Sequence, residues 1–236
     1  YYFGYDEKAW NCQQMLAAMG QRLLSPAEYH GVFVSLPLAG QQALLAERLR
    51  GRRHLLILDN LESVTGAPLA IQHTLSPDQQ AEVRGFLTQL TGGKTLVLLG
   101  SRGGEEWLAQ DTFADNVYEL PGLDPEAAST LAERILERQQ ATRYRQDEQF
   151  LRLLKLLEGY PLALEVVLAN LARQTPAEVL TALQAGDVTL DTADSQTKTE
   201  SILRCIDYSH SNFSPDAQGL LACLAPFSGV INARLL

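Results

Sequence analysis

The feature that most constrains the fold is the stretch at residues 55–60, Leu-Leu-Ile-Leu-Asp-Asn, in which four aliphatic residues end abruptly in an acid. A continuous aliphatic run of this length predicts a strand buried on both faces, and such strands belong to parallel sheets covered by helices. Open α/β sheets bind ligands at the carboxyl ends of their strands, where Asp59 would lie. A carboxylate there can hold Mg²⁺ beside nucleotide phosphates. The alternative is a strand that runs into a plain Asp59-Asn60 turn, because both residue types favour turns.

The first half of the chain alternates helix and strand patterns. A second aliphatic strand is predicted at residues 95–99, and Gly-Ser-Arg follows it at 100–102. The other elements expected here are the end of a strand at 1–5, helices at 6–24, 39–49 and 76–90, a short helix that begins at Ser25, another at 105–110, and a last strand at 117–120. Helices that alternate with aliphatic strands indicate a parallel sheet, so we expect an α/β fold for residues 1–120.

From residue 121 onward the pattern is helical. Capping and apolar spacing predict helices at 124–140, 147–159, 161–172 and 175–183, which would form a small helical domain over residues 121–186. Residues 185–199 are polar and lack aromatics, which is typical of a linker or mobile loop. Two further helices, expected at 199–208 and 214–224, place a third domain in residues 187–236.

Composition and charge argue against several classes of protein. The 236 residues are 46% hydrophobic and 20% charged, as in an ordinary globular protein. No apolar run approaches the ~20 residues that span a bilayer, and the first residues lack the basic and apolar regions of a signal peptide. The net charge of −9 argues against binding of nucleic acid or anionic membranes by the bulk surface. Three scattered cysteines favour neither disulfides nor a zinc site, so a cytoplasmic location is the default.

Four motifs follow one another in a recognisable order. They are LLILDN at 55–60, LVLLGSR at 96–102, LEGYPLAL at 157–164, and DYSHSNFSPDAQ at 207–218 leading toward LAPF at 224–227. This series resembles the NB-ARC branch of the STAND signalling NTPases, which includes plant resistance proteins, apoptotic adaptors and bacterial regulators with tetratricopeptide or WD40 repeats. The resemblance implies the later part of a P-loop NTPase domain at 1–120, an ARC1-like helical domain at 121–186, and a linker with a partial winged helix at 187–236.

The resemblance also implies roles for individual residues. Asp59 would be the Walker B acid that positions Mg²⁺. Asn60 stands where the family often carries a second acid, and because an amide cannot act as a general base, we expect at most a slow ATPase in the full-length parent. Arg102 looks like the sensor 1 arginine that meets a γ-phosphate, the alternative being a surface arginine in a glycine-rich turn. Glu62 is interpreted as a solvated turn carboxylate, since its offset does not match the family position.

Two further features concern the nucleotide. Gly159 and Pro161 look like the Gly-x-Pro motif that packs the helical domain against the base, although Gly-x-Pro equally suits a plain turn between helices. No P-loop motif occurs in the chain: Gly-Gly-Lys-Thr at 92–95 precedes a strand, whereas a P-loop follows a strand and opens a helix. In the family this motif would lie just before Tyr1, and with no initiator Met the chain reads as a fragment cut at both ends.

The function that the resemblance implies is an ATP/ADP-dependent conformational switch. It would hold ADP at rest and form a homo-oligomer with ATP, and fused sensor or effector domains, such as tetratricopeptide or WD40 repeats, would lie outside this chain. One alternative is a degenerate interaction scaffold that binds no nucleotide. Another is a DNA-binding winged-helix ATPase, against which the acidic charge argues.

Overall fold

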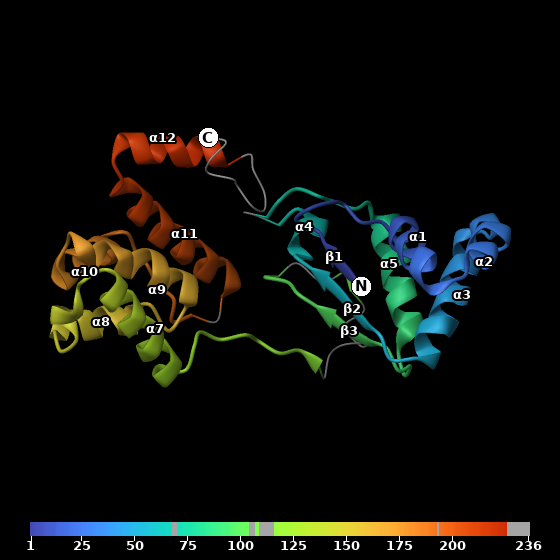
Figure 1. Ribbon diagram of the computed structural model, residues 1–236, viewed down its shortest axis with the longest axis horizontal. Coiled ribbons are helices and arrows are strands. Elements are labelled where there is room, and N and C mark those ends of the chain that lie inside the picture. The colour runs from blue at the N-terminus through green and yellow to red at the C-terminus, as the bar shows by residue number, and fades with distance from the viewer. Residues whose placement is uncertain (68–69, 104–106, 109–115, 193, 226–236) are drawn as a thin grey trace. The chain divides into compact units, whose positions relative to one another are not determined.

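The structure divides into two compact units. It is a computed structural model that describes residues 1–67, 70–103, 107–108, 116–192 and 194–225. The first unit, Tyr1–Tyr118, combines a small sheet with helices, and the second, Glu119–Leu236, is helical (Figure 1). The division falls close to the predicted boundary at residues 120–121, and each unit is described by itself below.

The sheet of the first unit is parallel. Its strands β1 (Tyr2–Gly4), β2 (Leu55–Asp59) and β3 (Leu96–Leu99) lie side by side in chain order. The register pairs Ile57 with Tyr2 on one side and with Leu98 on the other. A mostly helical protein with a parallel sheet of three strands agrees with the predicted α/β class at this coarse level.

Only one face of this sheet is covered within the described part of the chain. Helices α1 (Cys12–Leu23), α3 (Leu38–Gly51) and α5 (Pro77–Leu90) share one core with Phe3, Leu56 and Leu58. Side chains alternate along a strand, so the intervening residues point to the other face. There Leu55 of β2 is 45% exposed, and Leu96 and Leu98 of β3 are 65% and 54% exposed. The prediction that β2 is buried on both faces is therefore wrong for this structure.

The strand predicted at residues 117–120 is not formed. Val117, Tyr118 and Leu120 are among the most exposed apolar side chains of the described residues. Strand-like composition does not make a strand without a partner, because isolated extended backbone gains no ladder of hydrogen bonds. The short helix predicted at 105–110 falls largely on residues outside the described ranges.

Capping residues explain where α1, α2 and α5 of the first unit begin. The first helix starts at Cys12 rather than Asp6, because Asn11 Oδ1 accepts the backbone N–H of Gln14 at 2.9 Å in a capping box. Capping boxes at Ser25 and Ser76 begin α2 (Pro26–Gly31) and α5 where the sequence predicts them. The remaining short elements are η1 (Phe33–Ser35) and α4 (Glu62–Thr65), and the sequence predicts neither of them.

The second unit packs its helices around a separate core. Its elements are α7 (Pro125–Arg138), η3 (Thr142–Tyr144), α8 (Glu148–Leu156), α9 (Pro161–Leu168), η4 (Ala169–Ala172), α10 (Pro176–Ala185), α11 (Ser195–Ser211) and α12 (Pro215–Leu224). Helix α11 begins four residues before the predicted residue 199, because the side chain of Asp194 caps it. Cys205 of α11 is fully buried among residues of α7 to α10, so the core continues past the domain boundary predicted at 186–187.

The polar stretch between α10 and α11 is anchored rather than free. Ser201 Oγ accepts the backbone N–H of Thr189 at 3.0 Å and donates to the carbonyl oxygen of the same residue at 2.8 Å. Val188 and Leu190 are buried in the helical core. The interpretation of residues 185–199 as a linker or mobile loop is therefore wrong for residues 188–190, which pack into the helical unit. No helix in the described ranges is both long and apolar enough to cross a membrane.

Candidate functional site

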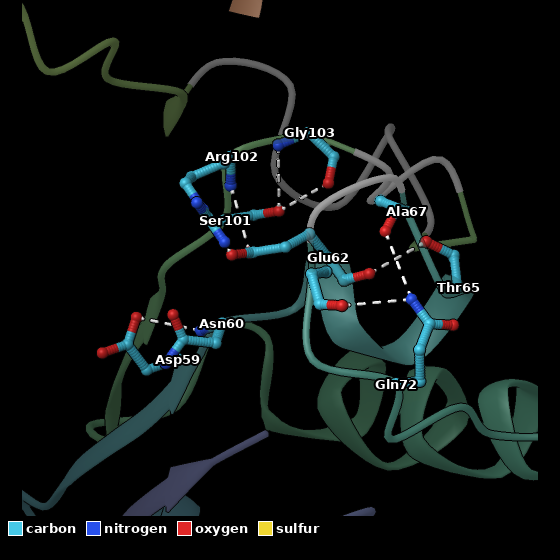
Figure 2. A network of polar contacts seen from close by, with 10 residues as sticks. Asp59, Asn60, Glu62, Thr65, Ala67, Gln72, Ser101, Arg102 and Gly103 are labelled. Carbon is cyan, nitrogen blue, oxygen red and sulfur yellow. Dashed lines mark hydrogen bonds and ion pairs between the residues drawn. The ribbon is translucent and has the colours of Figure 1, made fainter. Parts of the chain in front are cut away.

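The candidate site lies at the carboxyl edge of the parallel sheet. Because β2 and β3 are parallel neighbours, the segments that follow them leave the sheet together. The backbone N–H of Gly100 donates to Leu58 O at 2.8 Å, and that of Leu61 donates to Gly100 O at 3.1 Å. These bonds join the two segments. Figure 2 shows the polar contacts that the segments make, with Asp59 bonded to Asn60 and Arg102 bonded to Glu62.

Asp59 is half-buried at the end of β2. Its Oδ1 accepts the backbone N–H of Asn60 at 3.0 Å, and its Oδ2 accepts the hydroxyl of Tyr2 at 3.4 Å (Figure 2 shows the first of these bonds). A Cβ on Gly100 would lie only 2.3 Å from Asp59 Oδ1. Glycine at position 100 therefore leaves the space that the carboxylate occupies between the two strand ends.

Asn60 adopts a left-handed backbone conformation with a φ of 57°. Asparagine tolerates this region better than most residues, and the conformation turns the chain from β2 into α4. The Asp59-Asn60 turn considered from the sequence is thus present. It does not exclude a metal-binding role, since the carboxylate still lies at the edge where parallel sheets bind ligands.

Arg102 makes an ion pair with Glu62, for which the sequence predicts a position in solvent. Glu62 is 3% exposed, and its Oε1 accepts Nε of Arg102 at 2.7 Å while its Oε2 accepts the backbone N–H of Arg102 at 3.2 Å (Figure 2). The interpretation of Glu62 as a solvated turn carboxylate is wrong. The short helix α4 begins at Glu62, and the structure buries its side chain where the segment after β3 meets it.

One pattern in the sequence agrees with this pair, although it does not distinguish Glu62 from Asp59 as the partner of Arg102. The segments after β2 and β3 must meet if the strands are parallel neighbours, and each carries one residue of opposite charge close to the strand end. Arginine and carboxylate pair readily in partly buried places because the guanidinium offers several donors in fixed directions. The side chain of Arg102 remains 54% exposed, so the turn arginine is accessible as well as paired.

Gly159 and Pro161 lie in the helical unit, at the turn between α8 and α9. Pro161 is the first residue of α9, and Gly159 has a left-handed φ of 69°. Its carbonyl oxygen accepts the backbone N–H of Leu123 at 2.8 Å, and a Cβ on Gly159 would lie 2.4 Å from Leu123 O. A Cβ on Gly122 would lie 2.0 Å from Glu158 O. The motif is therefore needed for packing of the chain that enters this unit, independently of any ligand.

The predicted site residues thus form two pairs. Asp59 ends β2 and Arg102 follows β3 at the same edge of the sheet in the first unit, whereas Gly159 and Pro161 lie at one turn of the second unit. Two surface hollows on α3, one of them shared with α5, include none of these four residues.

Metal-ligating side chains and cysteine thiols are the other reactive groups to compare with this site over the described residues. Among the residues with described positions, no group of three or more His, Cys, Asp or Glu side chains could hold a metal ion. Burial raises the pKa of the Cys12 and Cys205 thiols to about 11, so both stay protonated at neutral pH. Asp59 fits the role of one carboxylate in a Mg²⁺ shell, because Mg²⁺ commonly takes one or two carboxylates and fills the remaining positions with water and phosphate oxygens.

Comparison of the chain with protein-family models, with curated proteins and with solved structures found no match.

Proposed function

We propose that this chain is the switch module of an NB-ARC-like signalling NTPase, which responds to the exchange of ADP for ATP. The observation that carries the proposal is that Asp59 ends one strand and Arg102 follows the neighbouring parallel strand, at the same carboxyl edge of one sheet. Such an edge is where open α/β folds bind nucleotides. The motif order along the chain supports the same proposal.

The two charges have different tasks in this proposal. Asp59 holds Mg²⁺, which neutralises charge on the phosphates when bound. Arg102 contacts the γ-phosphate, and so it distinguishes ATP from ADP. For Gly159 and Pro161 the proposal keeps the role that the resemblance implies, a contact with the base. The resting state holds ADP, and ATP favours a homo-oligomer because it makes contacts that ADP cannot make.

In this proposal the backbone amides that bind the nucleotide phosphates belong to a segment outside these residues. None of the 236 residues forms a P-loop, and the sequence at 92–95 leads directly into β3 instead of opening a helix. Backbone amides of a P-loop are the main contacts to the phosphates. We propose that a segment outside these residues supplies them. The alternative of an interaction scaffold that binds no nucleotide is favoured by one observation, the exposed apolar face with Leu55, Leu96 and Leu98.

The first prediction concerns the isolated chain. The 236 residues alone are expected to bind Mg-ATP or Mg-ADP with an affinity weaker than millimolar, because the phosphate cradle is absent from the sequence. Isothermal titration calorimetry of the purified chain measures this directly. Micromolar affinity would show that the phosphates are held by residues other than those assigned here.

The second prediction tests Asp59 in the full-length protein. Asp59→Ala should weaken Mg²⁺-dependent nucleotide binding by roughly ten- to hundredfold. Loss of a residue that only hydrogen-bonds to a metal ligand already lowers metal affinity by about this factor. The fold should persist, because Asp59 is a half-buried residue at a strand end. Nucleotide titrations with Mg²⁺ and with EDTA separate the metal-dependent part. Unchanged binding and turnover in Asp59→Ala would remove the metal-binding role.

Gly100→Ala provides a companion variant for the same test. Its Cβ would displace the carboxylate of Asp59, which is the end of a side chain and can move, whereas the backbone need not. We therefore expect a loss of Mg²⁺-dependent binding in the same direction as in Asp59→Ala, with little change in the unfolding midpoint. A loss in Asp59→Ala without one in Gly100→Ala would mean that the exact position of the carboxylate is unimportant.

A further inference from the structure

The contact between Glu62 and Arg102 differs from the other ion pairs of the described residues. In each of the others both side chains are between 38% and 73% exposed. The Glu62 side chain is 4% exposed, while that of Arg102 is 54% exposed. Exposed ion pairs contribute little to folding stability. Burial of a charged carboxylate costs desolvation free energy unless a positively charged or hydrogen-bonding partner offsets it. The buried carboxylate of Glu62 therefore depends on its contact with Arg102.

Glu62 uses both of its carboxylate oxygens on Arg102. One oxygen accepts Nε of the guanidinium and the other accepts the backbone N–H (Figure 2). The same carboxylate thus fixes the main chain at position 102 and the direction in which the side chain leaves it. Neither contact involves the terminal nitrogens Nη1 and Nη2. These two nitrogens carry four of the five N–H donors of a guanidinium, and they are the donors that commonly meet a phosphate.

We propose that Glu62 is a positioning residue, which orders Arg102 so that its terminal nitrogens can meet the γ-phosphate of ATP. This inference rests on the proposed function. A guanidinium already held at Nε loses less rotamer entropy when a phosphate binds than a free arginine side chain does. Glu62 therefore strengthens the binding of ATP without contacting the nucleotide, and it adds little to the binding of ADP.

The test is Glu62→Gln in the full-length protein, by paired titrations with Mg-ATP and Mg-ADP. Glutamine keeps one oxygen for Nε, but it replaces the other with an NH₂ group that cannot accept the backbone N–H. We expect ATP affinity to fall roughly tenfold, the effect of losing one hydrogen bond to a charged group, and ADP affinity to change less than about twofold. In an Arg102→Ala background the same substitution should cause no further loss, because the two residues act through one contact.

A matched control is Glu28→Gln. It removes the carboxylate from an exposed pair with Arg48 at 2.9 Å, so it should leave the affinity for both nucleotides unchanged. If Glu62→Gln does not fold, Glu62→Asp keeps the charge but shortens the reach by one methylene, and the same ATP-selective loss is expected. Unfolding midpoints of all variants are measured alongside, since a merely structural role of Glu62 would lower the midpoint without changing the ratio of ATP to ADP affinity.

The outcomes separate this inference from the proposed function. A loss of ATP affinity in Arg102→Ala without a loss in Glu62→Gln would overturn the positioning role alone. An increase of ATP affinity in Glu62→Gln would also overturn it, because the carboxylate would then be a competitor of the phosphate. An equal loss for ATP and ADP would make Glu62 a structural residue. No loss in Arg102→Ala would overturn both the positioning role and the role of Arg102 in the proposed function.

Discussion

Replacing Arg102 by alanine in the full-length protein is expected to weaken ATP binding by roughly ten- to more than a hundredfold. The lost contact is a charge-assisted hydrogen bond, which contributes ~1.5–3 kcal/mol, and each 1.4 kcal/mol is a factor of ten. ADP has no γ-phosphate, so its affinity should change little. Oligomerisation driven by ATP should be lost as well, because a ligand shifts an equilibrium only by its difference in affinity for the two states.

Paired ATP and ADP titrations, together with light scattering for the oligomeric state, measure these effects. The matched control is Arg48→Ala, because Arg48 has the same side-chain exposure of 54% and also pairs with a glutamate. It should bind both nucleotides as the unmodified protein does. An equal loss for ATP and ADP in Arg102→Ala would make Arg102 a general phosphate contact. If Arg102→Ala loses affinity for neither nucleotide, Arg102 is only a surface arginine in a glycine-rich turn.

Replacing Gly159 by alanine is expected to destabilise the helical unit by about 2–5 kcal/mol. A left-handed backbone costs a residue with a Cβ about 1–2 kcal/mol, and a forced contact in a packed region costs about 1–3 kcal/mol more. Here the Cβ would lie 2.4 Å from Leu123 O, a backbone atom that cannot rotate away as the end of a side chain can. Since a domain has only about 5–15 kcal/mol of stability, the variant should unfold much more easily.

Denaturant unfolding of the 236-residue chain tests this prediction. Gly122→Ala should destabilise in the same way, because its Cβ would lie 2.0 Å from Glu158 O on the other side of the same contact. The control is Gly219→Ala in α12, where a Cβ meets no atom within 4 Å and alanine should stabilise the helix by about 0.5–1 kcal/mol. If Gly159→Ala were as stable as Gly219→Ala, the close approach at this turn would not exist in solution.

This result would also affect how the Gly-x-Pro motif is interpreted. Gly159 is required by the backbone of residues 122–123 whether or not a nucleotide binds. A loss of nucleotide binding in Gly159→Ala would therefore not prove a contact with the base. A substitution of Tyr160, which precedes α9 and is half-buried, is less disruptive for that question because its backbone φ is an ordinary −68°.

The sequence by itself determined the features that depend on local chemistry. Ser25, Ser76, Asp147 and Thr175 begin helices where the sequence predicts them, because a capping side chain bonds backbone two or three residues away. The aliphatic runs at 55–59 and 96–99 became neighbouring parallel strands, since continuous aliphatic runs of this length favour strands. The places of Asp59 and Arg102 at the ends of these strands followed directly.

Only the tertiary structure decided what those residues contact. Glu62 and Arg102 are 40 positions apart, and no local pattern distinguishes a buried glutamate from one in solvent. The space at Gly100 and the close approach at Gly159 likewise depend on backbone that arrives from elsewhere in the chain. The segment 117–120 has strand composition but forms no strand, and β2 keeps one face open, because pairing and covering are supplied by neighbours rather than by the residues themselves. Local hydrogen bonds are thus specified within a few residues, whereas burial and ion pairing are specified by packing.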